Sequence, residues 1–452
     1  MGRAARILTF IAALVALLGA TVAVGCGGDD DGGSSGGGSA AAVPEQYRIP
    51  ETTVKFGNAE FIDHTDAILG VEKGWFEEVG IKLDPEPAGG LYTPADHAST
   101  LLSKKVDVLS SNYQILLPAL NKTDELKMFA YGDFFIGFAL MGDKKFKSFT
   151  EIKEAGKSDQ EALKEAAAQL EGATLTWSPD PAVRNFGKTV MQGAGLSQSD
   201  IKLESLNDAQ GVQLMLAGRA DFQIGGAPTR ITLEKEGFKP IVTAADLTGI
   251  VEPPYESSAE LAAVSTNGWG TTQDFWESDP DTVMRMASVK WRISQFIADN
   301  PDEAAEPHVQ QLNRAAGTDL TPEDAKIIYR SIDPYIPFGE QGDLWFNPDK
   351  PTYELTMIQA AINQAEAGGT LDKGQAEPED ITIAHLVYAR AVELKAEADA
   401  AMKATEDGLD GASEEARGTA EDLLAAAKQQ YDAFNYLDAA RLAKAAQKEV
   451  SG

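Results

Sequence analysis

Residues 53–83 read TVKFGNAEFIDHTDAILGVEKGWFEEVGIKL, and this stretch decides the fold class. Residues 53–57 are short and β-prone, which predicts a strand. Residues 65–79 place apolar side chains at helical spacing and stop before Gly80, and glycine commonly ends helices. Residues 81–83 predict a second strand. A strand, a helix and a strand in this order are typical of a βαβ unit in a parallel sheet.

The same alternation continues along the chain and then starts again, which predicts two α/β lobes. A chain of 452 residues exceeds one ordinary core, in agreement with two or more domains. The further predicted strands are 106–110, 127–130, 135–141, 173–177, 201–204, 220–224 and 261–266, and the predicted helices are 94–103, 151–169, 181–192 and 209–217.

Beyond residue 266 the pattern becomes helical, with helices predicted over 281–298, 321–331, 352–366 and 381–394. From about residue 396 the composition shifts to Ala, Glu, Lys and Gln. Residues 391–406 and 414–449 predict two helices joined around 408–411, the second with one apolar face. We therefore expect a C-terminal α-helical hairpin, which serves most simply as a packing or docking element.

The N-terminus has the parts of a bacterial lipoprotein signal. Two arginines precede an apolar run over residues 7–25, and Cys26, the single cysteine, follows small residues. The Gly/Ser-rich stretch behind it is typical of a flexible tether. We expect residues 1–25 to be a signal peptide, Cys26 to be lipidated and 26–48 to be the tether. The alternative is an ordinary transmembrane anchor, since the apolar run is long enough to span a bilayer.

Composition excludes several classes of function. A formal charge of −31 disfavours nucleic-acid binding, because an acidic surface repels phosphates. One cysteine leaves none for disulfides or thiol catalysis. The four histidines lack metal-ligand spacing, so we expect neither a metal nor a cofactor. No nucleophile elbow and no phosphate-binding loop with lysine is present in the sequence, so no enzyme is indicated.

Three pieces of the sequence carry a resemblance: residues 67–81 (AILGVEKGWFEEVGI), residues 98–108 (ASTLLSKKVDV) and residues 213–222 (QLMLAGRADF). Their order and spacing over about 200 residues resemble the solute-binding proteins of ATP-binding-cassette importers. Within that family they are similar to the group serving nitrate, taurine, alkanesulfonates and thiamine pyrimidine precursors. In residues 98–108, Ser103 stands where the family usually has Gly.

The resemblance implies a two-lobe, periplasmic-binding-protein-like fold of type II, with two crossing strands near 135–141 and 261–266. The implied first lobe is 49–140 with 258–395, and the second lobe is 141–257. Residues 396–452 form an extension that the family does not explain.

Polar side chains and glycines follow the predicted strands, in expected loops such as 110–113 and 177–180, at the edge where open α/β sheets bind ligands. The resemblance implies a role for His64, because the pair His64-Thr65 is similar to a His-Thr pair of the pyrimidine-precursor binders. The alternatives are a surface residue at a helix start for His64 and a plain turn for Gly90. Tyr113 and Trp177 are expected outside the sheet layers, as two facing aromatic walls. The candidate ligand-binding residues are Asn58, His64, Gly90, Ser110, Ser111, Asn112, Tyr113 and Asp133 in the first lobe, and Trp177, Ser178, Arg184, Gly225 and Gly226 in the second.

The expected function is capture of a small organic or oxyanion solute by lobe closure and delivery to the importer's membrane permease. The protein would be a monomer on the extracytoplasmic face of the membrane. One alternative is an enzyme of pyrimidine-precursor synthesis, which shares the fold but needs cytoplasmic precursors that an exported protein cannot reach. Another is a surface sensor or scaffold that uses the helical tail. The charges of the candidate residues do not identify the solute.

Overall fold

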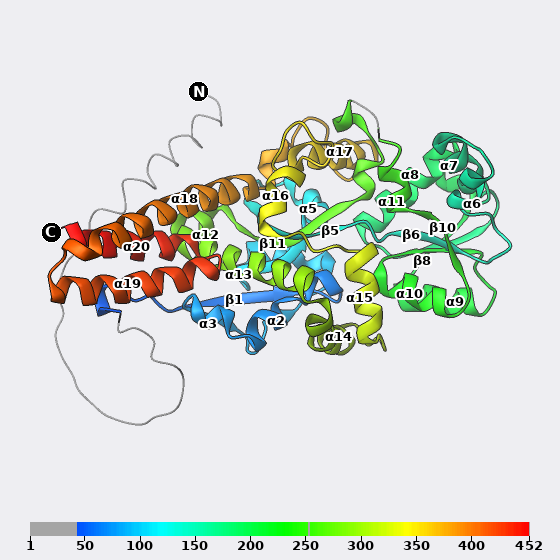
Figure 1. The fold of residues 1–452 in the computed structure, drawn as a ribbon. Coiled ribbons are helices and arrows are strands. Elements are labelled where there is room, and N and C mark those ends of the chain that lie inside the picture. Colours follow the sequence, from blue (N-terminus) through cyan, green and yellow to red (C-terminus); the bar gives the residue numbers. More distant parts are fainter. Residues whose placement is uncertain (1–42, 252–253, 452) are drawn as a thin grey trace. The chain divides into compact units, whose positions relative to one another are not determined.

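The computed structural model describes residues 43–251 and 254–451 (Figure 1). The predictions for the signal peptide, Cys26 and nearly all of the tether lie outside these residues. Within them, no helix combines the length and the apolar character needed to cross a membrane. The described chain is a mixed α/β protein with two separate sheets, as the sequence predicts.

The first sheet has the strand order β2–β1–β4–β11–β5, and the short β3 also pairs with β1. β1 runs parallel to β2 and β4, which confirms the βαβ unit expected from residues 53–83. β11 runs antiparallel to both β4 and β5. The bounds are β1 (Thr52–Asn58), β2 (Ile81–Asp84), β3 (Gly90–Leu91), β4 (Val108–Asn112), β5 (Leu126–Phe135) and β11 (Ser265–Thr272).

The second sheet has the order β10–β6–β9–β7–β8. β7 is parallel to β8 and β9, while β6 is antiparallel to β9 and β10. Sequence reasoning missed β10 and the helices α10 and α11 beside it. The bounds are β6 (Ala139–Gly142), β7 (Thr174–Trp177), β8 (Lys202–Ser205), β9 (Phe222–Gly225), β10 (Lys239–Thr243), α8 (Pro181–Gly193), α9 (Asp208–Leu216), α10 (Ala227–Lys235) and α11 (Ala244–Thr248).

The chain passes between the sheets twice, close to the two expected positions. The first passage lies between the end of β5 at Phe135 and the start of β6 at Ala139, so the predicted strand over 135–141 is two strands with a bend. The ring of Phe138 in this bend lies 4.6 Å from that of Phe135. On the return, residues 261–263 form a short helical turn, and the strand begins only at Ser265 and runs to Thr272.

β11 is the central strand that the sequence hides best, because it contains two glycines. A Cβ atom on Gly268 would lie 1.9 Å from the carbonyl oxygen of Ala130 on β5, so only glycine fits this close approach. The next residue, Trp269, is fully buried and its ring lies 5.1 Å from the ring of Phe56 on β1. The core of the first lobe is therefore built around an interior strand that contains two glycines.

Helices cover both sheets, α6 and α7 packing in the second lobe, and most lie where the sequence predicts them. The predicted helix 151–169 is wrong in one respect: it is two helices, separated near Gly156, whose φ is +93°. α14 was not predicted. The bounds are α2 (Ala67–Glu72), α3 (Trp75–Glu78), α4 (His97–Leu102), α5 (Tyr113–Leu116), α6 (Phe149–Glu154), α7 (Asp159–Ala168), α12 (Gln273–Ser278), α13 (Pro280–Asp299), α14 (Pro301–Ala316), α15 (Pro322–Ser331), α16 (Phe338–Leu344) and α17 (Glu354–Ala367).

The C-terminal helices are present and pack on one another as α18 (Ala384–Gly408), α19 (Glu414–Asp432) and α20 (Tyr436–Ser451) (Figure 1). The predicted second helix over 414–449 is broken between α19 and α20, where Phe434 has a φ of +60°. Position 396, the expected start of the extension, lies inside the continuous α18. The bundle is attached to the first lobe, since Arg285 of α13 pairs with Asp438 of α20 at 2.8 Å.

Candidate functional site

Polar side chains gather at the carboxyl ends of β1, β4 and β5, where the parallel strands of the first sheet end. Ser110, Ser111 and Asn112 are buried within β4, so the expectation of a loop at 110–113 is wrong. Asn112 caps the next helix, α5, by accepting a hydrogen bond from Ile115 N at 3.0 Å. Asn58 closes β1 and donates to the carbonyl oxygen of Ala88. These two amides therefore shape the sheet edge.

Two histidines lie side by side at this edge, with ring centroids 6.1 Å apart: His64, and His97 of α4. Burial acts to lower the pKa of His64, but Asp63, whose carboxylate is 3.3 Å away, outweighs it and the pKa is raised. Burial lowers the pKa of His97 to about 3, and the charge of His64 adds to this effect. His97 is thus neutral, and its Nδ1 lies 2.8 Å from Ser111 Oγ.

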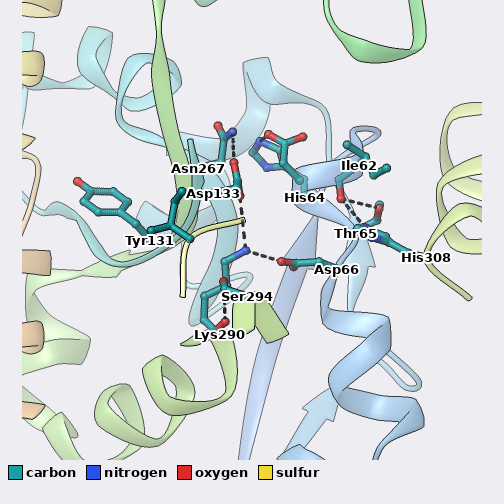
Figure 2. A network of polar contacts seen from close by, with 12 residues as sticks. Ile62, His64, Thr65, Asp66, Tyr131, Asp133, Asn267, Lys290, Ser294 and His308 are labelled. Carbon is teal, nitrogen blue, oxygen red and sulfur yellow. Dashed lines mark hydrogen bonds and ion pairs between the residues drawn. The ribbon is translucent and has the colours of Figure 1, made fainter. Parts of the chain in front are cut away.

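A charged network adjoins these histidines (Figure 2). Asp133 Oδ1 accepts a hydrogen bond from Asn267 Nδ2 at 2.8 Å, and its other oxygen lies 3.9 Å from Lys290 Nζ. Lys290 also pairs with Asp66 at 2.5 Å. Burial acts to lower the pKa of Lys290, but the charges of Asp66 and Asp133 outweigh burial and the pKa is raised. The ammonium group is therefore charged. Burial raises the pKa of Asp133 to about 7, although Lys290 opposes this shift.

His308 of α14 fixes the loop that carries His64. Its Nε2 lies 2.6 Å from the carbonyl oxygen of Ile62 (Figure 2). Its Nδ1 lies 2.8 Å from the hydroxyl of Tyr329. Burial lowers the pKa of His308 to about 4, so it is neutral. Sequence reasoning missed His308, Lys290 and Asn267, because each comes from an element distant in sequence. The sequence contains one signal of this network: Lys290 stands among the apolar positions of α13, where a charged side chain is unusual.

In the second lobe, the expected loop at 177–180 begins within the sheet. Trp177 is the last residue of β7, and its ring packs so closely on α8 that a Cβ on Gly187 would lie 2.6 Å from it. The expectation that Trp177 lies outside the sheet layers is therefore wrong. Asp180 caps α8 by accepting from Ala182 N at 2.7 Å, and Ser178 Oγ accepts from Asp180 N. One turn into α8, the buried Nε of Arg184 has no hydrogen-bond partner among the described residues.

The two lobes contact each other around α8. Gln364 of α17 in the first lobe donates a hydrogen bond to the carbonyl oxygen of Asn185 on α8 at 3.2 Å, and α8 also packs on α5, which starts at the end of β4. Burial raises the pKa of Asp180 before α8, while the charge of His64 opposes the shift and that of Asp63 adds to it. Burial also raises the pKa of Asp208 to about 6, and the charge of Asp180 adds to this effect.

Other predicted residues lie apart from this meeting point or beneath it. Tyr113 is the first residue of α5, not a loop residue, and its buried hydroxyl lies 3.4 Å from the carbonyl oxygen of Val264. Gly90 pairs with Gly57 in the sheet, against the ring of Tyr92.

The glycine pair of the second lobe ends β9 and starts the connection to α10. Gly225 allows close packing of Thr229, because an added Cβ would lie 2.5 Å from that side chain. Gly226 faces the ring of Phe135 at the first passage between the sheets, with 3.4 Å from an added Cβ to that ring. Gly225 therefore has a packing role in the fold, whereas the space at Gly226 would also accept a Cβ atom.

Comparisons with known proteins agree with this architecture. No protein-family model matches the chain, and no curated protein matches it either. Among solved structures, one similar protein is the sulfonate-binding protein SsuA of Methylobacillus flagellatus KT, a putative transporter component. It has 14% identity and a TM-score of 0.51, and the alignment covers 76% of this chain and 95% of that one. The nitrate-binding protein NrtA of Synechocystis PCC 6803 has 13% identity and a TM-score of 0.51, covering 78% and 89%.

A third structure, the alkanesulfonate-binding protein SsuA of Xanthomonas axonopodis pv. citri bound to MOPS, has 13% identity and a TM-score of 0.50, covering 74% and 98%. At such identities the likeness establishes the fold. The chain has the two-lobe fold of the periplasmic solute-binding proteins of ATP-binding-cassette importers, as the resemblance in its sequence implied.

Proposed function

We propose that this protein captures a small solute between its two lobes and delivers it to an ATP-binding-cassette importer. One observation carries the proposal: α8, which follows β7 in the second lobe, packs on α5, which follows β4 in the first, so the carboxyl ends of both sheets lie at the contact between the lobes. Closing two α/β lobes around a solute is a known hinge motion. The lobes in this proposal are 49–140 with 258–395, and 141–257. A binding role needs no catalytic group.

The solute-contacting groups in this proposal are the ones at the meeting of the lobes. His64 carries a positive charge when protonated, and Arg184 has a buried donor that no described residue uses. Both suit an oxyanion or an organic acid group, because guanidinium binds such groups in a fixed geometry. Two of the similar structures are a sulfonate-binding and a nitrate-binding protein. Asp180 and Ser178 would contact the uncharged or cationic part of a small organic solute.

Tyr113 and Trp177, which the sequence predicts to be two facing aromatic walls, have a supporting role in this proposal. Both are buried within the lobes, so they support the binding surface from beneath and do not form its walls. Asp133 and Ser111 similarly hold the neighbouring side chains in place.

A thermal-shift panel of small anions, sulfonates and organic acids tests the proposal. A solute at 100 times its dissociation constant stabilises a protein by about 2.7 kcal/mol. We expect Arg184→Gln to abolish the shift, whereas Arg219→Gln, at an exposed position of the same lobe, preserves it. Small-angle scattering should show a smaller radius of gyration with the solute. A panel without any stabilising solute, or saturation without compaction, contradicts lobe closure.

We also propose that the protein is anchored outside the cell membrane by a lipid on Cys26. The support is the order of arginines, apolar run, small residues and Cys26 in the sequence. We expect Cys26→Ala to move the protein from the membrane fraction to the medium or to leave an unprocessed precursor. Ser34→Ala in the following Gly/Ser stretch serves as the control. Mass analysis of a membrane-bound form with Met1 retained and an unmodified Cys26 would refute the anchor.

A further inference from the structure

Three carboxylates that are far apart in sequence meet beneath the solute site. They belong to Asp63 in the loop after β1, Asp133 on β5 and Asp333 after α15, and we call them the acidic cluster. One oxygen from each lies within 4.8 Å of the other two, and all three residues are buried. Such spacing allows a single ion to contact all three oxygens at ordinary distances for a hard cation.

The acidic cluster has more negative charge than its surroundings balance. Asp66 adds a fourth carboxylate, and the cationic side chains within the network are Lys290 and His64. With every group ionised, the described residues leave an excess of about two negative charges, and burial makes such an excess very costly. A divalent cation removes it. Two protons, one of them shared by Asp133 and Asp333, would also remove it, and this is the competing explanation.

A second observation points to a bound ion. Apart from a hydrogen bond with Asp133 inside the acidic cluster, neither oxygen of the buried Asp333 has a hydrogen-bond partner among the described residues, and the buried hydroxyl of Tyr335 has none. Tyr335 pairs with Asp133 across an isolated antiparallel β-bridge, and Lys290 Nζ, which lies 3.9 Å from Asp133, is 5.7 Å from the centre of the Tyr335 ring. The phenol is therefore next to the acidic cluster, where its neutral oxygen can serve as a fourth ligand to a metal ion.

We propose that Asp63, Asp133 and Asp333, with Tyr335, bind one divalent metal cation. All the groups offer oxygen, so the cation belongs to the hard class of Ca²⁺, Mg²⁺ and Mn²⁺. The ion would link the loop that carries His64, the end of β5 and the segment after α15. It would thereby hold rigid the loop that carries His64, next to the network of polar contacts in Figure 2. The ion is a structural one and is independent of whether the proposed solute is correct.

The test uses the full-length chain, stripped with a chelator and without any added solute. Titration calorimetry with Ca²⁺, Mg²⁺ and Mn²⁺, and elemental analysis after dialysis against each, should find one bound ion per chain. Asp333→Asn should weaken binding by roughly tenfold or more, as loss of a metal-site group does. Asp319→Asn, a nearby exposed acid, should leave binding unchanged.

Two results would overturn the proposal. One is a wild-type chain that binds none of these cations at concentrations on the order of 1 mM, the weak end for extracellular sites. The other is an Asp333→Asn variant that folds and binds the ion as tightly as the wild type. If that variant does not fold, the wild-type titration and Asp63→Asn decide the question. A negative result here leaves the solute panel untouched, since that panel contains no divalent metal.

Discussion

The buried ion pair between Arg285 of α13 and Asp438 of α20 offers the sharpest test of how the C-terminal helices are attached. Its side chains are 4% and 1% exposed, and the Nε–Oδ2 distance is 2.8 Å. Asn435 donates a further hydrogen bond to Asp438 at 2.9 Å. Removing one partner of such a pair leaves the other charge buried without compensation, which typically costs about 3–5 kcal/mol. We therefore expect Asp438→Asn to lower the free energy of unfolding by about 3 kcal/mol.

Urea denaturation followed by tryptophan fluorescence measures this loss, and the change should fall on the unfolding of the first lobe. The control is Lys444→Ala, which removes an exposed ion pair between α20 and Glu397 of α18. Exposed pairs contribute about 0–1 kcal/mol, so this variant should be nearly neutral. A loss below about 1 kcal/mol for Asp438→Asn, or equal losses in both variants, would show that the pair does not hold the helices on the lobe.

The pH dependence gives the same test an independent readout. Burial acts to raise the pKa of Asp438, but the hydrogen bond and charge of Arg285 outweigh it and the pKa is lowered. A lowered carboxyl pKa gives stability that is present above the unfolded value of about 3.9 and is lost as the pH falls through the folded value. The stability difference between the wild type and Asp438→Asn should therefore narrow below about pH 4. A difference that stays constant into acid would contradict the assignment.

Three further outcomes follow from the packing. Lys290→Ala should cost about 3–5 kcal/mol in urea denaturation, because buried carboxylates lose their counter-charge, and a loss under 1 kcal/mol would contradict a charged lysine. Gly268→Ala should prevent soluble folding, since its Cβ would overlap Ala130 O, and a folded variant with unchanged circular dichroism would refute the close approach. Trp177→Ala should lower the free energy of unfolding of the second lobe by about 3–5 kcal/mol, because its ring fills space against Gly187. A variant that keeps its stability and loses only solute affinity would show that the ring contacts the solute.

The ion pair between Arg285 of α13 and Asp438 of α20 changes how a function of the C-terminal tail can be tested. For a separate hairpin, deletion of residues 396–452 would test a sensor or scaffold role of the tail. The deletion would cut α18 within its length and leave Arg285 without Asp438. The single substitution Asp438→Asn tests attachment without removing the surface that a partner would bind.

The sequence by itself determined the repeating α/β pattern and much of the sheet edge. Local spacing was enough for the βαβ unit of residues 53–83 and for α8, because helix periodicity and terminal glycines act within one element. The same reasoning chose Ser111 and Asp133, since polar residues at strand ends stand out against apolar strands, whereas the role of His64 came from the resemblance. It misplaced β11 at 261–266 instead of 265–272, because the close approach that Gly268 allows is set by the neighbouring strand β5.

Only the tertiary structure decided which charges face each other. Lys290 lies 224 residues from Asp66, and Asp438 lies 153 from Arg285. No periodicity links such residues, because a pair across the fold is set by the packing of whole helices and strands. Burial also strengthens the interaction between these charges. On the surface, water would screen the same carboxylates, and they would shift one another's pKa little. The sequence placed polar groups at the sheet edge, and the packing around them fixed their partners and protonation.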